Sequence, residues 1–193
     1  MRQLLLLFTL MLILTNSCNV SGSQFATCKR TEFNYGKEVN KYAAEFNLPA
    51  DYLKALIVLE CSGKKDVSSR FEKHVYKRLK MLRDGRISRY ERIRQKDIID
   101  ASDEALKNLA RSWGPFQLMG YKCLQLGINV HDVRGEQSIY YGIKWINEDY
   151  GNYLRKGEFE QAFRIHNTGS PTGKTYDPDY VKKGLERIQF FGD

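Results

Sequence analysis

The stretch ALIVLECSGKK, residues 55–65, ends an uninterrupted apolar run with an ionisable carboxyl. Residues 56–59 are apolar and belong in a core, and Glu60 follows them with no basic residue beside it. Pro49 lies a few residues upstream, and proline favours the first turn of a helix. The stretch therefore predicts a buried helix that begins near Pro49 and leads to Glu60.

Apolar residues at helical spacing continue on both sides of this segment. Val39, Tyr42, Ala43 and Phe46 follow the i, i+3, i+4, i+7 spacing of one helix face. Further helices are expected to begin at capping or turn residues: Ser69 with Glu72, Ser102, Gly114-Pro115, Asp132, and Asp177-Pro178. Alternating strand patterns are scarce. The chain is therefore predicted to be mostly α, and a small β-hairpin near the basic residues stays open.

The first residues have the features of an export signal. Arg2 is followed by an apolar run over residues 4–14 and by small polar residues up to Cys18. This run is shorter than the roughly 20 residues that span a bilayer. LTNSC is similar to the motif that precedes a lipidated bacterial cysteine, which predicts an anchored lipoprotein facing the periplasm or cell surface, with free release as the alternative. The predicted segments are a signal peptide over 1–17, a linker over 18–34 and one domain over 35–193.

The cysteines and histidines indicate neither a disulfide framework nor a metal site. An odd number of cysteines remains after Cys18, so at most one bridge can form among Cys28, Cys61 and Cys123. The sequence leaves that pairing open. The histidines lack ligand spacing, and no glycine-rich phosphate loop is present. Neither a metal nor another cofactor is expected.

The positive charge is concentrated in one segment. Between Lys64 and Lys96 there are thirteen Lys or Arg and four Asp or Glu, and the whole chain has a net charge of +8. Such a segment either binds an acidic partner or is the solvated face of a helix. For an exported protein, the acidic partners to consider are peptidoglycan stem carboxylates, lipid phosphates and anionic glycans. Nucleic acid is disfavoured by the export signal.

Glu60 is the first candidate for chemistry. Apolar packing disfavours the anionic form of a carboxyl and raises its pKa. A carboxylic acid that stays protonated near neutral pH can give a proton to a leaving oxygen, as glycosidic cleavage requires. A glutamate at a helix end can also simply leave the core for solvent, so Glu60 alone does not decide between these interpretations.

Three other segments strengthen the catalytic hypothesis. They are ARSWGPFQLMGYKC (110–123), FRIHNTG (163–169) and TYDPDYVKKGLERI (175–188). With LECSG, their elements GPFQLM, HNTG and DYV occur in the order typical of the lytic transglycosylase and goose-type lysozyme superfamily. The chain resembles that superfamily over about residues 35–190. RFEKHVYKRL and SWGPFQLMG are similar to segments of its bacterial and phage N-acetylmuramidase branch.

The resemblance implies a single lysozyme-like helical domain and a role for each matched residue. Glu60 would be the general acid and later the base. Gln117 would hydrogen-bond the sugar, and Met119 would line the cleft. Asn167 would shape the sugar-binding loop, and Tyr180 would reach back towards the glutamate. Each of the last four could instead serve local packing or backbone hydrogen bonding.

The chain departs from the superfamily pattern beside the acid and in the third motif. Cys61 stands where a serine is usual, and His166 replaces a tyrosine. A two-carboxylate mechanism needs a second acid, and Glu72 and Asp66 are the nearest candidates, although Glu72 also fits a capping box. Transglycosylases need no second acid, because the N-acetyl and C6 hydroxyl groups of the substrate take part and leave a 1,6-anhydro end.

The function implied by the resemblance is cleavage of the β-1,4 bond after N-acetylmuramic acid in peptidoglycan, by hydrolysis or by transglycosylation. The implied partners are peptidoglycan strands and, through the lipid anchor, a membrane. The alternative function is a catalytically inactive, lipid-anchored protein that binds peptidoglycan or acts as a scaffold. The sequence indicates neither the oligomeric state nor the biological context.

Overall fold

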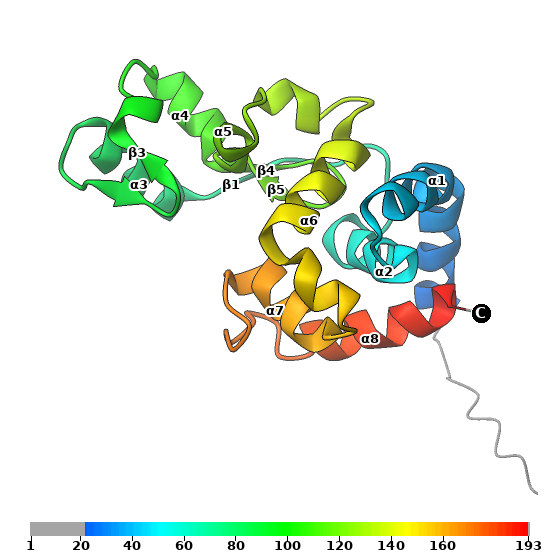
Figure 1. Cartoon of the computed structure of the whole chain (residues 1–193). Helices are drawn as coiled ribbons and strands as arrows, with labels where there is room; N and C mark the ends of the chain where they lie inside the picture. The colour runs from blue at the N-terminus through cyan, green and yellow to red at the C-terminus, as the bar shows by residue number, and fades with distance from the viewer. Residues whose placement is uncertain (1–21, 193) are drawn as a thin grey trace, which may run out of the picture.

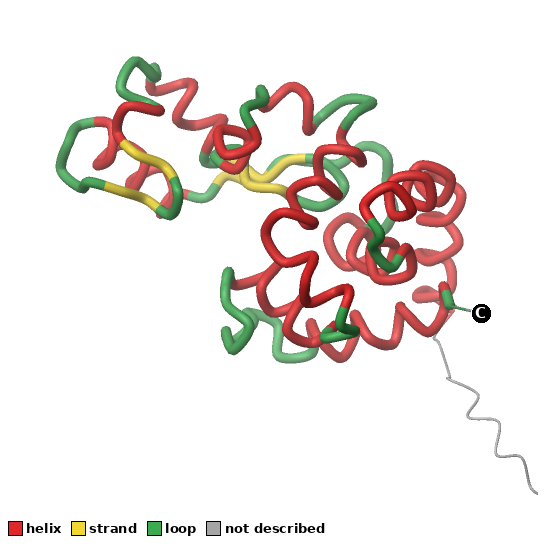
Figure 2. The backbone as a smooth tube through the Cα atoms, viewed as in Figure 1, coloured by secondary structure: helices red, strands yellow, loops and turns green. Residues whose placement is uncertain are grey.

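The computed structural model describes residues 22–192. The predicted signal peptide over 1–17 and Cys18 lie outside the described residues. The described part contains eight α-helices and five strands of two or three residues, and this confirms the predicted mostly α fold (Figure 1, Figure 2). No helix between residues 22 and 192 is both long enough and apolar enough to cross a bilayer.

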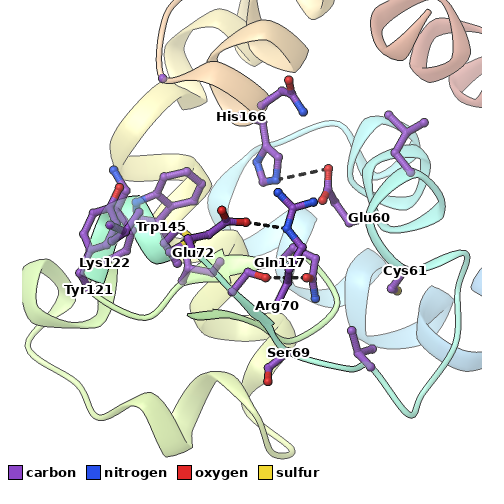
Figure 3. Close-up of a pocket in the computed structure, with 18 of the residues that line it drawn as sticks. Glu60, Cys61, Ser69, Arg70, Glu72, Gln117, Tyr121, Lys122, Trp145 and His166 are labelled. Atoms are coloured by element: carbon purple, nitrogen blue, oxygen red, sulfur yellow. Dashed lines mark hydrogen bonds and ion pairs between the residues drawn. The ribbon is translucent and has the colours of Figure 1, made fainter. Parts of the chain in front are cut away.

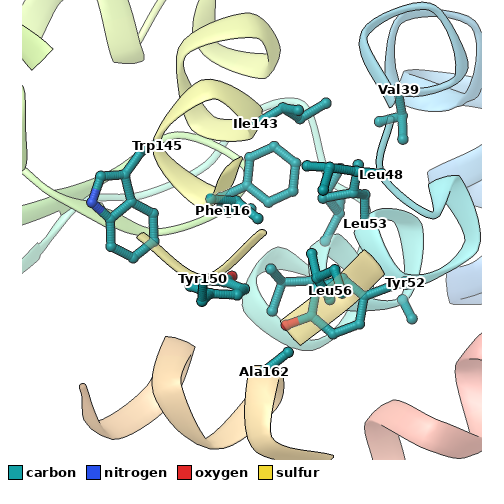
Figure 4. Close-up of a cluster of buried hydrophobic side chains, with 14 of the residues drawn as sticks. Val39, Leu48, Tyr52, Leu53, Leu56, Phe116, Ile143, Trp145, Tyr150 and Ala162 are labelled. Atoms are coloured by element: carbon teal, nitrogen blue, oxygen red, sulfur yellow. The ribbon is translucent and has the colours of Figure 1, made fainter. Parts of the chain in front are cut away.

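Five helices form the larger lobe, with α2 at its centre (Figure 1). These helices are α1 (Gly22–Phe46), α2 (Ala50–Cys61), α6 (Ser138–Arg155), α7 (Phe159–Thr168) and α8 (Tyr180–Phe191). Every residue of α2 from 52 to 58 is buried, because α1 and α8 pack along the helix. Leu53 and Leu56 share one cluster with Phe116 and Ile143 (Figure 4). The apolar run before Glu60 is therefore a core helix, as predicted.

Residues 72–110 form a small lobe with a core of its own. Its elements are α3 (Lys73–Arg83), β2 (Arg89–Tyr90), β3 (Ile93–Arg94), the 3-10 turn η1 (Gln95–Asp97) and α4 (Asp103–Leu109). Its buried apolar residues are Val75, Leu79, Leu82, Ile93, Ile98, Leu106, Leu109 and Ala110, joined by Tyr121. β2 and β3 pair as an antiparallel hairpin. This hairpin lies in the basic segment, where the sequence allowed a small β-hairpin without deciding for or against it.

A three-stranded antiparallel sheet joins the two lobes. It contains β1 (Arg70–Phe71), β4 (Arg111–Trp113) and β5 (Leu118–Met119) in the order β1-β4-β5. Arg70 is paired with Ser112, which in turn is paired with Met119. The helix α5 (Lys122–Leu126) and the 3-10 turn η2 (Val130–Val133) then lead back to α6. The sheet thus fixes the chain just before α3 against the larger lobe.

The predicted linker over 18–34 is wrong for the residues that the structure describes. α1 begins at Gly22 and continues to Phe46. Cys28 and Thr31 are buried in this helix because one of its faces packs on α2 and α8. The helical domain therefore includes residues 22–34 and begins before the predicted boundary at residue 35.

Two predicted helix starts are wrong because the residues involved flank a paired strand or lie in the turn between two strands. Ser69 and Glu72 form no capping box, since residues 70–71 are extended in β1 and the Ser69 hydroxyl accepts a hydrogen bond from an arginine of β4. Gly114-Pro115 forms the turn between β4 and β5 rather than a helix. Gly114 has a φ of +69°, and a Cβ there would collide with the carbonyl oxygen of Val133.

The other predicted starts are closer to the structure. Ser102 caps α4 through its hydroxyl, as predicted. Asp132 lies in η2 and accepts a hydrogen bond from a backbone N–H there, whereas α6 itself begins at Ser138. The last helix begins at Tyr180, directly after the Asp177-Pro178 turn.

Candidate active site

The cleft between the two lobes has a volume of about 980 Å³. Its lining includes eight residues that were singled out from the sequence as site candidates or as departures from the superfamily pattern: Glu60, Cys61, Asp66, Glu72, Gln117, Met119, His166 and Asn167. Tyr180 is not a lining residue, but it reaches Glu60 from α8 across 120 positions of sequence. The fold therefore brings these residues to one cleft and brings Tyr180 to the carboxyl of Glu60. Figure 3 shows Glu60, Glu72, Gln117 and His166 in this cleft.

Glu60 occupies the last turn of α2, where the core helix meets the cleft. Its side chain is 17% exposed. Its Oε1 atom accepts a hydrogen bond of 2.5 Å from the hydroxyl of Tyr180. The same oxygen lies 3.9 Å from Nε2 of His166, on the cleft side of α7 (Figure 3). The carboxyl is thus buried on most sides and held by a neutral donor.

Burial raises the pKa of Glu60 to about 7. The low-polarity surroundings penalise the carboxylate more than the acid. The Tyr180 hydroxyl and the positive charge of Arg70 act in the opposite direction, because both favour the carboxylate. The balance leaves the group poised to give or to take a proton near neutral pH.

His166 lies beside Glu60 and is a neutral neighbour rather than a second acid. Burial lowers its pKa to about 4. Its Nε2 atom is 3.1 Å from the carbonyl oxygen of Phe116, which can only accept, so Nε2 carries the proton. Its Nδ1 atom then accepts a hydrogen bond of 2.8 Å from the hydroxyl of Tyr150. Both ring nitrogens are engaged, and this fixes the orientation of the ring.

Glu72, the possible second carboxylate, is held in an ion pair. Its Oε1 atom accepts a hydrogen bond of 2.5 Å from Nε of Arg70, and its Oε2 lies 3.6 Å from Nδ1 of His74. The guanidinium of Arg70 lies between Glu72 and Glu60 in Figure 3. Its charge also acts on the pKa of Glu60. Arg70 therefore pairs with Glu72 and also favours the carboxylate of Glu60, and it is a residue that sequence reasoning missed.

Gln117 lines the cleft, but its amide is engaged within the protein. Its Oε1 accepts a hydrogen bond of 2.7 Å from the hydroxyl of Ser112. Its Nε2 donates to the carbonyl oxygen of Gly114 at 3.1 Å. Gln117 also has a φ of +48°, which is uncommon for a residue with a side chain. In this structure the residue shapes the β4–β5 turn and offers no free amide group to a sugar.

Met119 and Asn167 line the cleft from different elements, β5 and α7. Met119, in β5, is half-buried and also packs against the core of the small lobe. Asn167 is exposed near the end of α7. The side-chain amide of Asn167 is thus more accessible to a ligand than the side-chain amide of Gln117.

Cys61 lines the cleft beside the acid, but its thiol is inert near neutral pH. Burial raises the pKa of Cys61 to about 11. Its Sγ atom lies 3.4 Å from the carbonyl oxygen of Ile57 and 3.8 Å from that of Lys64, and it can donate to either. Cys28 and Cys123 are buried and also free. The one bridge that the sequence left open is therefore not formed among these three cysteines.

A second cluster lines the part of the cleft away from Glu60 (Figure 3). The Tyr121 hydroxyl donates to Glu91 at 2.6 Å, and the Lys122 ammonium is 2.5 Å from the other oxygen of the same carboxylate. Lys122 also lies 5.3 Å from the centre of the Trp145 ring. Sequence reasoning missed these residues, because Glu91 is about 30 positions from its partners and no local pattern signals the contact.

Residues 22–192 contain no group of three or more side chains arranged to hold a metal ion. The chain matches no known protein-family model, no curated protein and no solved structure in comparisons with each. The resemblance described above therefore depends on the four sequence motifs alone.

Proposed function

We propose that this protein is a peptidoglycan-cleaving glycosidase that acts on the β-1,4 bond after N-acetylmuramic acid, with Glu60 as general acid and base. The observation that carries the proposal is the carboxyl of Glu60, buried against the core helix at the edge of a large cleft, with its pKa raised to about 7. Glycosidic cleavage needs such a carboxylic acid. The order of the four motifs supports peptidoglycan as the substrate.

In the proposed reaction, protonated Glu60 donates its proton to the glycosidic oxygen as the bond breaks. The carboxylate that results is stabilised by the hydrogen bond from Tyr180 and by the charge of Arg70. It can then accept a proton from the attacking hydroxyl or water. His166 stays neutral and supports the carboxyl from the side. One buried acid thus serves both steps.

The ion pair between Arg70 and Glu72 argues against Glu72 as the second carboxylate of a hydrolase and in that respect supports transglycosylation. A second carboxylate that acts as base or nucleophile has to face the sugar on the other side of the scissile bond. The Oε1 atom of Glu72 instead accepts a 2.5 Å hydrogen bond from Arg70. The C6 hydroxyl of the substrate would then attack, and the products would carry 1,6-anhydromuramyl ends. Asp66, the other candidate, is exposed at the cleft and forms no ion pair within residues 22–192, so product analysis decides between the two reactions. Mass spectrometry of released muropeptides tests this directly, because products without anhydro ends would indicate hydrolysis.

The decisive experiment compares the wild type with Glu60→Gln on purified sacculi. We expect wild type to release muropeptides and Glu60→Gln to release about a hundredfold to ten-thousandfold less, the usual size of a general acid–base contribution. The matched control is Glu45→Gln, an exposed glutamate of α1 that should leave release unchanged. If neither wild type nor Glu60→Gln releases muropeptides while both bind sacculi, the alternative of an inactive binding or scaffold protein is correct.

The export and anchor predictions belong to the same proposal. The chain would be lipidated at Cys18 and held at a membrane surface. Cys18→Ser should then release the protein from the membrane fraction and abolish its labelling by a fatty-acid analogue. Equal membrane retention of both proteins would contradict the anchor without affecting the proposed activity.

A further inference from the structure

The basic segment carries nine cations that the protein itself does not neutralise. Of its thirteen Lys and Arg, four form ion pairs: Arg70, Lys80, Arg83 and Arg92. The other nine are all exposed and form no ion pair within residues 22–192. They are Lys64, Lys65, Lys73, Lys77, Arg78, Arg86, Arg89, Arg94 and Lys96, here called the basic surface. Seven of them lie on the small lobe, which has a core of nine buried residues. Repulsion between these cations lowers the stability of the lobe.

The β2–β3 hairpin concentrates this repulsion in one pair. Arg89 lies directly opposite Arg94 in the ladder. Like charges at directly opposed positions destabilise a two-stranded sheet. If the surface served only to contact solvent, the Arg89–Arg94 pair would lower stability without any benefit. An acidic residue at either position would remove the repulsion. Two guanidinium groups at adjacent positions are instead suited to bind carboxylate or phosphate oxygens.

The same hairpin borders the candidate active site. Tyr90 and Glu91, between the two arginines, line the cleft. Arg92 forms a 3.3 Å ion pair with Asp149 of α6, which fixes the hairpin tip to the larger lobe. Lys64 belongs both to the basic surface and to the cleft lining. A polymer bound in the cleft would therefore contact the basic surface at the point where the polymer extends out of the cleft.

We propose that the basic surface, centred on Arg89 and Arg94, binds the carboxylates of stem peptides on the glycan strand held in the cleft. This inference rests on the proposed function and narrows its substrate to strands that still carry their peptides. Each N-acetylmuramic acid carries one acidic stem peptide, so a strand presents carboxylates at every second sugar along its length. The nine cations extend beyond the cleft, so they could contact the carboxylates of several successive stem peptides on one strand.

A membrane is the less favoured source of negative charge because of the position of the N-terminal end of α1. Phe25 packs on Phe190 at a ring distance of 5.4 Å, so α1 begins beside the end of α8. Both lie at the opposite end of the molecule from the small lobe (Figure 1). A membrane that held the chain through Cys18 would thus be far from Arg89 and Arg94.

The test measures binding to two soluble glycan strands of matched length, one with its stem peptides and one from which an amidase has removed them. Calorimetric titrations use Glu60→Gln as the background, so that the strands stay intact. We expect this protein to bind peptide-bearing strands about tenfold more tightly than peptide-free strands, and the preference to weaken with added salt. Arg89→Glu with Arg94→Glu should abolish the preference and leave binding to peptide-free strands unchanged.

The control variant is Lys156→Glu with Lys174→Glu, which changes the net charge equally at two exposed positions outside the basic surface. It should keep the preference. Arg89→Glu alone separates binding from misfolding, because it places a carboxylate opposite Arg94. This single variant should raise the thermal midpoint of unfolding while it weakens binding to peptide-bearing strands.

Several outcomes would overturn the proposal. Equal binding of both strands by the background protein would do so, as would equal losses in the hairpin and control variants. Vesicles of phosphatidylglycerol form a third arm, and tight vesicle binding without a peptide preference would assign the basic surface to lipid. Failure here is distinguishable from failure of the proposed function, which would appear as an absence of Glu60-dependent muropeptide release.

Discussion

Replacement of Glu60 by glutamine should stabilise the protein, and more at high pH than at low pH. The pKa of Glu60 is about 7 in the folded protein against an ordinary value of 4.5. The folded state therefore binds the proton more tightly than the unfolded state, so the stability that Glu60 contributes is complete below pH 4.5 and falls as the pH rises towards 7. A difference of about 2.5 pKa units corresponds to about 3 kcal/mol at pH 8.

Glutamine avoids this loss because it has nearly the same shape, stays neutral and can still accept the hydrogen bond from Tyr180. Urea unfolding of both proteins at pH 4 and pH 8 measures the effect. We expect closely similar free energies of unfolding at pH 4 and an advantage of about 3 kcal/mol for Glu60→Gln at pH 8, or about 6 to 12 °C in the midpoint of thermal unfolding.

The control for this experiment is Glu45→Gln. Glu45 is exposed on α1, so its replacement should change the free energy of unfolding by the same small amount at both pH values. The reasoning is refuted if Glu60→Gln gives the same difference at pH 4 and pH 8, or if wild type gains stability relative to it between these values. Either result would mean that the carboxyl is not buried as described, and the proposed acid would lose its physical basis.

Three further predictions follow from single contacts. Tyr180→Phe removes a hydrogen bond that favours the carboxylate, so the alkaline limb of the muropeptide-release profile should move up by about one pH unit, and an unchanged or lower limb would contradict this role. Gly142→Ala would place a Cβ against the ring of Phe116 and should destabilise by about 1 to 3 kcal/mol in urea unfolding, whereas Gly22→Ala, where space is open, should be close to neutral. The Cys61 thiol should react slowly with a disulfide reagent at pH 8 in the folded protein and rapidly in urea, because burial raises its pKa to about 11, and fast labelling of folded protein would show this assignment to be wrong.

The parts of the fold that sequence reasoning predicted are those set by local patterns. Pro49 and the apolar run after it determine α2, and the hydroxyl of Ser102 caps α4, without help from distant residues. The predictions failed for the linker before residue 35, for the capping box at Ser69 and Glu72, and between residues 112 and 137. In the last of these segments β4 pairs with β5 as a short hairpin, and Gly114-Pro115 lies in its turn. The hairpin is completed by the pairing of β4 with β1, which lies in a distant part of the sequence that local spacing does not reveal.

The candidate site shows the same division. The order of the motifs predicted that Glu60, Gln117 and Tyr180 belong to one site, but it did not predict the hydrogen bonds of each residue. His166 is oriented by a carbonyl 50 positions away, and Arg70, in a two-residue strand, pairs with Glu72 and places its charge near Glu60. Such contacts follow from the arrangement of whole elements, and the residue types alone do not signal them.

The two separate cores have a consequence for local unfolding. Nine buried apolar residues hold the small lobe and twenty-four form the larger cluster within residues 22–192, and Val130 packs against both. Amides of the small lobe should therefore exchange their hydrogens through openings that leave α2 closed. A ligand that contacts both lobes would suppress those openings and slow amide exchange in the small lobe first. Exchange measured peptide by peptide would then map occupancy of the cleft even in a protein that cannot cut its substrate.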